Sequence, residues 1–160
     1  MRYLIEIAVA LLAVILQVVV GNFVSIIGAT PDLVLIYLIW VVLRRGQLHA
    51  ELVGFALGLF LDVLSSGTPG AHALSYTIVG FLLGYFFNED QIEQRLRNWP
   101  FLLFVFVGSV INNLIYYFFF TQGTGINFID YATMRGGLVT IYTTIIAVIP
   151  MFYQTRRPLY

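Results

Sequence analysis

The strongest constraint on this chain is a series of six long apolar segments, separated by short clusters of turn-forming or charged residues. Inside a bilayer such segments satisfy their backbone groups only as helices or as a closed barrel, and no long alternating strand pattern is present. We therefore predict an all-α polytopic membrane protein, a six-helix transmembrane bundle forming a single integral membrane domain over residues 1–160. The predicted spans are Tyr3–Val20, Pro31–Leu43, Leu48–Leu64, Ala71–Phe87, Phe101–Phe120 and Gly136–Tyr153.

The composition agrees with a membrane protein and argues against several other classes. Hydrophobic residues make up 60% of the chain and charged residues only 10%, well below the share found in ordinary globular domains. The net charge is zero, so no basic surface favours nucleic acid, and the chain has no Cys for disulfides, thiolate catalysis or metal sites. The first apolar run is interrupted by Glu6 and lacks a clear cleavage site, so we interpret it as a retained span.

The arginines predict the orientation of the bundle, because basic residues concentrate on the cytoplasmic side. With six spans and a cytoplasmic N-terminus, seven of the eight arginines lie inside and only Arg135 lies outside. The second segment has 13 residues, about 20 Å of helix against a hydrocarbon core of ~30 Å, although Arg44 and Arg45 can reach to the interface. A five-span alternative moves only Arg2. We expect six spans with both termini in the cytoplasm.

The start of the second segment carries signals for helix initiation. Thr30 is a suitable capping residue, Pro31 suits the first helical position, and Asp32 in the first turn favours the positive end of the helix dipole. We therefore expect Thr30 to cap this helix.

The stretch Asn88–Trp99 is the only strongly polar part of the chain. It contains Arg95 and Arg97, of which the second is spaced for an ion pair with Glu93 on one helix face. With Arg44 and Arg45, these arginines define the predicted cytoplasmic interface. We favour an interfacial helix or an extension of the fourth span, and the alternative is a docking site for a cytoplasmic partner.

Small residues recur every four positions in the third and fourth segments. Gly54, Gly58 and Asp62 share one face of the third predicted helix, and Gly80 with Gly84 repeats the spacing in the fourth. Glycines at this spacing let a neighbouring helix approach closely. Two interpretations remain: the glycines pack these two helices together, which we favour, or they form a surface for a partner.

Asp62 lies near the outer end of its predicted helix, which gives it two structural roles. It is solvated at the interface, or it accepts hydrogen bonds from the serines and free amides of the following turn; a ligand or proton site is the functional alternative. Glu51 lies about 16 Å away along the axis, too far for a two-carboxylate mechanism. We expect Glu51 to pair with Arg44 or Arg45.

Asn112 and Asn113 lie near the middle of the fifth segment, where unpaired amides are costly. At least one should therefore face another helix, and Gly108, one turn earlier, permits close approach. We favour hydrogen bonding between helices over the lining of a polar cavity. In the sixth segment Thr140 and Thr143 belong to a small, weakly polar stripe that should pack inward.

The sequence contains no recognisable catalytic or metal-binding pattern. His49 and His72 are predicted on opposite sides of the membrane, so they cannot share a metal. The patterns H-E-x-x-H and G-x-S-x-G and the Walker-type glycine loop do not occur. We therefore expect neither enzymatic activity nor a cofactor.

Two stretches, Pro31–Gly46 and Glu51–Leu74, together resemble the rod shape-determining membrane protein family MreD. The family pattern is a Pro-Asp start to an apolar helix, basic residues after it, then G-x-x-x-G-L-x-x-D and a small-residue turn. The chain matches this pattern through Pro31, Asp32, Arg44, Arg45, Gly54, Gly58, Leu59 and Asp62. The last two segments carry no signature of the family.

The resemblance implies a multi-pass protein of the bacterial inner membrane. It implies a partner, MreC, and membership of the cell-elongation machinery (the elongasome) with MreB, the glycosyltransferase RodA and its transpeptidase. It also implies a fold similar to the S components of energy-coupling vitamin transporters. We therefore expect a non-catalytic scaffold that binds MreC and helps to position or regulate peptidoglycan synthesis. The alternative is a small-solute-binding membrane component with Asp62, Asn112 and Asn113 facing a cavity.

Overall fold

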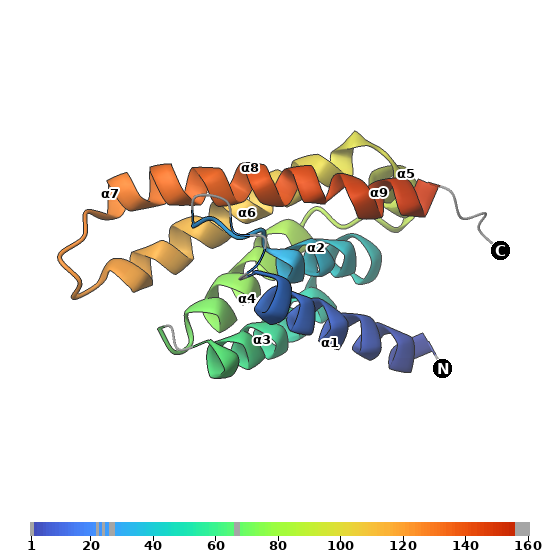
Figure 1. Cartoon of the computed structure of the whole chain (residues 1–160). Helices are drawn as coiled ribbons and strands as arrows, with labels where there is room; N and C mark the ends of the chain where they lie inside the picture. The colour runs from blue at the N-terminus through green and yellow to red at the C-terminus, as the bar shows by residue number, and fades with distance from the viewer. Residues whose placement is uncertain (1, 22, 24, 26–27, 66–67, 156–160) are drawn as a thin grey trace.

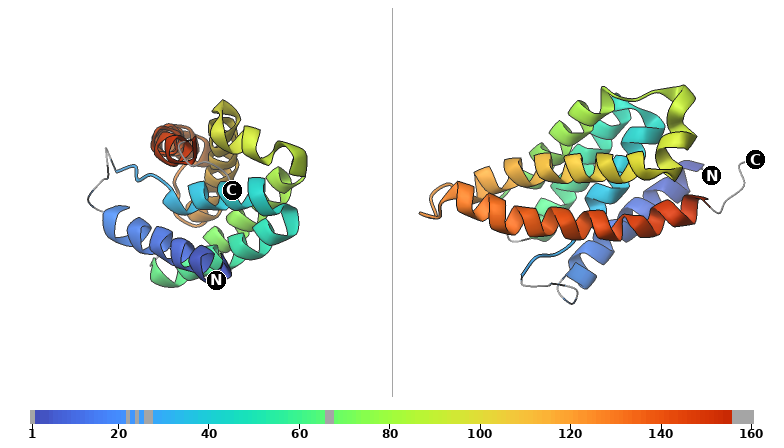
Figure 2. Two further views of the ribbon diagram at one scale, coloured as in Figure 1. Left: turned by 90° about the vertical axis from the view of Figure 1, so that its right-hand side faces the viewer. Right: turned by 90° about the horizontal axis from the view of Figure 1, so that it is seen from above.

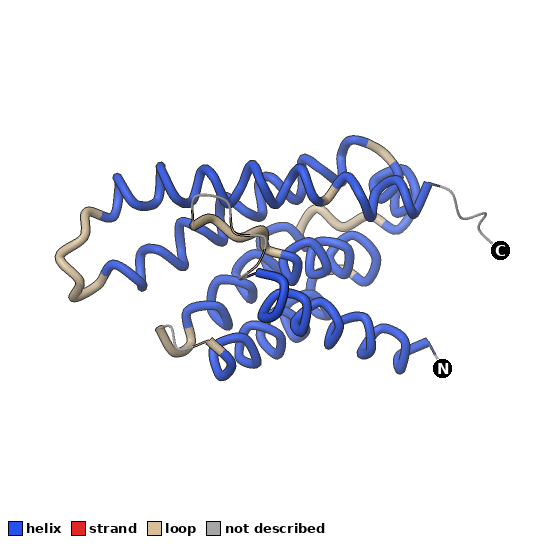
Figure 3. Tube along the Cα trace, viewed as in Figure 1, coloured by secondary structure: helices blue, strands red, loops and turns tan. Residues whose placement is uncertain are grey.

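The structure is a computed structural model that describes residues 2–21, 23, 25, 28–65 and 68–155. Helices form nearly all of this part of the chain, and no strand occurs in it (Figure 3), so the all-α prediction is confirmed. A 3-10 turn (Glu89–Gln91) precedes α5, and a π-helical turn (Ala132–Gly136) joins α7 to α8. The α-helices are α1 Arg2–Gly21, α2 Leu33–Arg45, α3 Gln47–Leu64, α4 Ala71–Gly84, α5 Ile92–Arg97, α6 Trp99–Thr121, α7 Phe128–Tyr131, α8 Gly137–Ile146 and α9 Val148–Thr155.

Among the residues that the structure describes, three helices are long and apolar enough to cross a membrane by length and composition: Gln47–Leu64, Trp99–Thr121 and the continuous run Phe128–Tyr153. Two shorter apolar helices, Glu6–Val19 and Ala71–Gly84, accompany them. The last helical run begins at Phe128, eight residues before the predicted start at Gly136, because α7 and the π turn extend it. Membrane helices are thus supported for part of the chain, and the full six-span bundle stays a prediction.

The short helix α2 lies inside the protein, between α1 and the pair formed by α6 and α8 (Figure 2). Its apolar residues are buried around almost the whole circumference; Val34, Leu38 and Val42 have no exposed surface. A helix that is hydrophobic all round belongs in a core. Because the surrounding helices and not lipid cover α2, its 13 residues need not match the thickness of a bilayer.

The helix α6 and the run α7–α9 form a long antiparallel hairpin, with the α6–α7 loop at one end (Figure 1). The beginning of α1, the α2–α3 junction, α5 and the end of α9 all lie at the other end. The two ends of the described chain therefore lie at the same end of the bundle. The placement of both termini in the cytoplasm remains a prediction, since the structure contains no membrane.

Glycines bring α3 and α4 into backbone contact along their whole length. A Cβ atom added at Gly54 would lie 2.7 Å from the Tyr76 carbonyl oxygen, and one added at Gly58 would lie 2.5 Å from the Ala73 backbone. In the other direction, a Cβ at Gly80 would lie 2.9 Å from the backbone of Ala50, and one at Gly84 2.5 Å from Gln47 Cα. All four glycines therefore face the opposite helix of this pair within the chain.

Charged residues at the opposite end from the α3–α4 turn join neighbouring helices. Arg45 forms an ion pair with Glu6 of α1, and the Tyr37 hydroxyl donates to the Glu6 carbonyl oxygen at 3.1 Å. Arg45 thus pairs with the carboxylate of α1, and the expected pairing of Glu51 with Arg44 or Arg45 stays a prediction. Arg44 instead stacks over the Trp40 ring, 4.8 Å from its centroid.

The polar stretch after α4 folds as a short turn and a short helix. Asn88 accepts a hydrogen bond from the Asp90 amide and so caps the 3-10 turn. Arg95 donates to the Phe86 carbonyl oxygen and, at 2.7 Å, to Gln91 Oε1, which ties α5 back to the end of α4. The Arg97 side chain lies outside the described part, so its expected pair with Glu93 stays a prediction.

Candidate functional site

Asp32 sits at the start of α2 and serves as the N-cap of that helix. Its Oδ1 accepts a hydrogen bond from the Leu35 amide at 2.8 Å. The expectation that Thr30 caps this helix is therefore wrong. Pro31 fixes the chain one residue before the cap, and Asp32 itself supplies the acceptor for the free amides. The carboxylate is thereby held at the N-terminal end of a buried helix.

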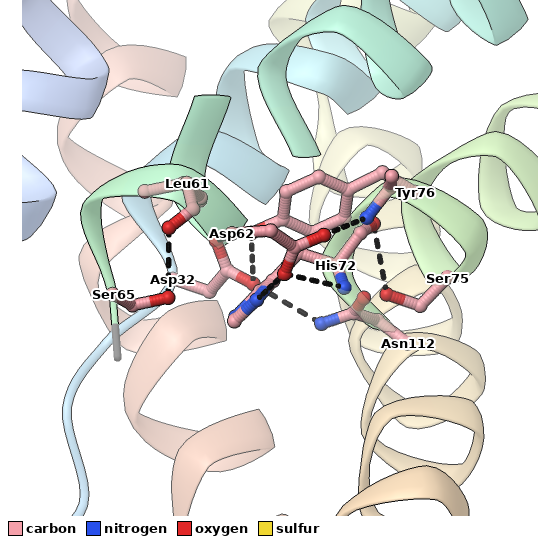
Figure 4. A network of polar contacts seen from close by, with 9 residues as sticks. Asp32, Leu61, Asp62, Ser65, His72, Ser75, Tyr76 and Asn112 are labelled. Carbon is pink, nitrogen blue, oxygen red and sulfur yellow. Dashed lines mark hydrogen bonds and ion pairs between the residues drawn. The ribbon is translucent and has the colours of Figure 1, made fainter. Parts of the chain in front are cut away.

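Asp32 forms hydrogen bonds with three further helices, and Figure 4 shows those with Tyr76 and Asn112. The Tyr76 hydroxyl of α4 lies 2.8 and 2.9 Å from the two carboxylate oxygens, and Asn112 Nδ2 of α6 donates to Oδ2 at 3.1 Å. The Asp32 amide donates to Thr143 Oγ1 of α8 at 2.9 Å. One residue thus connects α2 to α4, α6 and α8.

The Asp32 carboxyl group is surrounded by hydrogen-bond donors. The groups in contact with its oxygens are the Leu35 backbone amide, the Tyr76 hydroxyl and the Asn112 amide nitrogen, each of which can donate. Asp32 is 8% exposed. Among the residues that the structure describes, no cationic side chain lies within ion-pair distance of it. In the described part of the chain, the site therefore holds a buried carboxyl group by hydrogen bonds and without a cationic partner.

The two asparagines of α6 have different partners. Asn113 Nδ2 donates to the Gly136 carbonyl oxygen at 3.2 Å and to Thr140 Oγ1 at 2.9 Å, and so connects α6 to the start of α8. Asn112 uses its amide nitrogen for Asp32, which fixes the orientation of the amide group. Its Oδ1 is buried and has no hydrogen-bond partner in the described part of the chain. Such an unpaired acceptor is uncommon in a protein interior.

Asp62 caps the N-terminus of α4. Its oxygens accept from the backbone amides of His72 at 3.1 Å and Ala73 at 3.0 Å, and Oδ1 lies 2.8 Å from His72 Nδ1. Solvation at the interface is therefore the wrong interpretation, since the Asp62 side chain is 4% exposed. The amides that it binds belong to the next helix rather than to the turn serines, and Gly70, the N-cap position of α4, has no side chain for this task.

A cavity of about 520 Å³ lies beside Asp32. It reaches from α1 across to the α6–α8 pair, and its volume is in the range of small-molecule sites. Both asparagines line it, whereas Asp62 does not, although its partner His72 does. Its other lining side chains include Gln17, Asp32, Tyr76, Tyr116, Tyr117, Phe120, Tyr131 and Arg135. The asparagines thus both bond between helices and face a polar cavity.

The tyrosines and Arg135 were not singled out from the sequence as site residues. Tyr76 follows His72, whose amide Asp62 caps, by one helical turn, and Tyr116 with Tyr117 follows the asparagines by the same interval. Aromatic residues one turn away from polar ones in an apolar helix are a weak signal for such a site. The Arg135 side chain reaches the cavity by donating to the Gly28 carbonyl oxygen, a contact 107 residues apart in sequence.

A comparison with protein families identifies the group to which this arrangement belongs. The family model for the rod shape-determining protein MreD matches residues 1–157 of the chain. The chain belongs to the MreD family. No curated protein and no solved structure matches it. The match covers the last two predicted segments as well, for which the motifs gave no signature.

Membership in the MreD family establishes the broad role of the chain. It is a rod shape-determining protein, and its apolar helices agree with a membrane location. The family is described by its part in cell shape and not by a reaction. The expected likeness to the S components of vitamin transporters stays a prediction, since no solved structure matches.

Proposed function

We propose that this chain is a non-catalytic inner-membrane scaffold of the cell-elongation machinery, which binds the membrane helix of MreC. The observation that carries this proposal is the family match over residues 1–157. Through MreC the scaffold acts indirectly on MreB, RodA and its transpeptidase, and so helps to position or regulate peptidoglycan synthesis. Binding energy within the bilayer comes from helix packing and hydrogen bonds between helices.

The glycine seam between α3 and α4 limits where MreC can bind. Gly54, Gly58, Gly80 and Gly84 already contact the opposite helix of their pair, so they are not open to a partner. Exposed apolar side chains remain on several helices, among them α1, α3 and the α8–α9 run, where Ile145 and Ile149 are 61% and 70% exposed. We place MreC on one of these exposed stripes, against large side chains.

Co-expression with MreC, followed by purification in mild detergent, tests the proposal. We expect the two proteins to elute together, and an unrelated protein with a single membrane helix of the same length serves as the control. The chain has no native Cys, so single cysteines on each stripe can be cross-linked to MreC without background. We expect cross-links on one stripe and none at Gly58. Recovery of the two proteins only as separate species would refute MreC binding.

Small-solute binding is the second candidate function, and one observation favours it: the cavity of about 520 Å³ beside Asp32 and Asn112. Asn112 lines this cavity and carries a buried Oδ1 without a hydrogen-bond partner in the described part of the chain, an acceptor that a bound molecule would satisfy. Native mass spectrometry of the protein released from nanodiscs tests this function, because a bound solute adds a defined mass. This role is compatible with the scaffold role, since the MreC stripes lie on the outside of the bundle.

A further inference from the structure

We propose that the cavity beside Asp32 binds a small zwitterionic molecule, with its ammonium group facing Asp32 and its anionic group facing Arg135. The inference rests on the second candidate function, solute binding, and assigns the chemical class of the solute. Four observations carry it: the buried carboxyl group of Asp32, the unpaired acceptor of Asn112, the aromatic wall and the exposed arginine.

The first observation is that Asp32 is a buried carboxyl group without a cationic partner among the described residues. Hydrogen bonds from Tyr76, Asn112 and the Leu35 amide reach its oxygens, but none of these donors is cationic. Carboxyl groups within membrane bundles face partners or cavities, and the cavity lies directly beside Asp32. A ligand cation in the cavity would pair with this carboxyl group and hold it in its charged form.

The second observation is the free acceptor of Asn112. The amide nitrogen of Asn112 donates to Asp32 Oδ2 at 3.1 Å. Its Oδ1 is buried without a hydrogen-bond partner in the described part of the chain, and Asn112 is one of the residues that line the cavity. An acceptor next to a carboxylate suits an ammonium group, which carries several donors on one centre.

The third observation is the aromatic wall of the cavity. Tyr116 stacks on Phe120 with ring centroids 6.1 Å apart, and Phe120 stacks on Tyr131 at 5.6 Å. Aromatic faces attract ammonium groups through their quadrupole. A metal ion is a poorer fit, since the described residues contain no group of three His, Cys, Asp or Glu side chains placed to hold one.

The fourth observation is Arg135, which supplies a guanidinium group to the described lining of the cavity. The Arg135 side chain is exposed. One of its N–H groups donates to the Gly28 carbonyl oxygen, which is an uncharged acceptor. A guanidinium group in this state pairs well with a carboxylate or phosphate. The cavity thus offers an anionic and a cationic pole to the same molecule. A free amino acid and the head group of a zwitterionic lipid both carry this chemistry.

The test uses the full chain in nanodiscs of phosphatidylglycerol, with phosphoethanolamine and glycine as soluble probes and their N-acetylated forms as controls without an ammonium group. We expect at least one probe to bind by calorimetry, and its N-acetylated form to bind at least about tenfold more weakly. Nanodiscs that also contain phosphatidylethanolamine separate the sources. If this lipid weakens probe binding and its mass stays on the protein in native mass spectrometry, the natural ligand is the lipid head group. If the lipid leaves probe binding unchanged, the natural ligand is a free solute.

Variants test the role of the carboxylate. Asp32→Asn keeps the capping ability and the acceptor for Tyr76 but removes the charge, and we expect it to weaken probe binding about tenfold or more. Asp130→Asn is the matched control, because Asp130 is exposed on α7 and does not line the cavity. If Asp32→Asn does not fold, Tyr116→Leu removes part of the aromatic wall and should weaken the same probes.

Three results would overturn the proposal. The first is equal binding of a probe and its N-acetylated form, and the second is wild-type affinity in Asp32→Asn. The third is no binding of any ammonium probe. In that last case native mass spectrometry separates the two failures. A retained molecule without an ammonium group leaves solute binding intact and refutes only the chemical class, whereas no retained molecule refutes both.

Discussion

Replacement of Gly58 by alanine is the sharpest test of the contact between α3 and α4. The added Cβ would lie 2.5 Å from the Cα and N atoms of Ala73 and from the His72 carbonyl oxygen. All three atoms belong to the backbone, so no side-chain rotation relieves the overlap. Since carbon atoms pack best at ~3.5–4 Å, the helices must separate by about 1 Å at this point.

The loss of folding stability caused by Gly58→Ala has two parts: overpacking between the helices and weaker hydrogen bonds to Asp62. Overpacking in a tight interior costs about 1–3 kcal/mol. The Asp62 bonds to the amides of His72 and Ala73, at 3.1 and 3.0 Å, lie one turn away and stretch with the separation. Hydrogen bonds to charged groups are worth about 1.5–3 kcal/mol each, whereas alanine gains only about 1 kcal/mol of helix propensity over glycine. We expect Gly58→Ala to lower the free energy of unfolding by about 3 kcal/mol.

Gly137→Ala provides a matched control. Gly137 lies in α8, and no atom lies within 4 Å of the Cβ that alanine would add. The same substitution there should leave stability unchanged or raise it by up to about 1 kcal/mol. Unfolding is measured by titration with sodium dodecyl sulfate in mixed micelles, followed by circular dichroism. If Gly58→Ala unfolds at the same detergent fraction as Gly137→Ala, the backbone contact is not as tight as we infer.

Three other substitutions probe the polar contacts. Tyr76→Phe removes the hydroxyl that donates to both oxygens of Asp32, so the free energy of unfolding should fall by about 1.5–3 kcal/mol in the same titration. An unchanged unfolding midpoint would contradict this hydrogen bond. Asp62→Asn keeps one acceptor for the α4 amides and should cost only about 1 kcal/mol, with MreC still co-purifying; loss of the complex at normal protein levels would overturn the capping role. Asn113→Leu removes the bonds to Thr140 and to the Gly136 carbonyl oxygen and should speed hydrogen exchange at the start of α8, but not in α3.

The helices and the α3–α4 contact could be predicted from the sequence because both depend on local pattern. Apolar segments between turn clusters indicate helices wherever backbone groups must bond internally. Two segments that are joined by a short turn and carry glycines at equal spacing are expected to pack against each other. Gly58 and Gly84 do contact the backbone of the opposite helix. Chain proximity and side-chain size carry this information without knowledge of the rest of the fold.

The position of α2 and the partners of Asp32 could not be predicted in this way. The length of α2 suggested a poor membrane span because it was compared with the thickness of lipid, whereas protein covers the helix. Asp32 is separated from Tyr76 by 44 residues and from Asn112 by 80, so no local spacing connects them. The ion pair of Arg45 with Glu6, 39 residues apart, was missed for the same reason.

Three of the residues that make the chain resemble its family act together on one short stretch of α4, residues 72–76. Gly58 lets this stretch approach α3, Asp62 binds its first two amides, and Asp32 of α2 accepts a hydrogen bond from the Tyr76 hydroxyl. The Pro-Asp start and the glycine-aspartate pattern lie on different helices, but both position the same stretch of α4. Because Tyr76 also lines the cavity, any change that moves this stretch reshapes the cavity wall and the site of Asp32 at once.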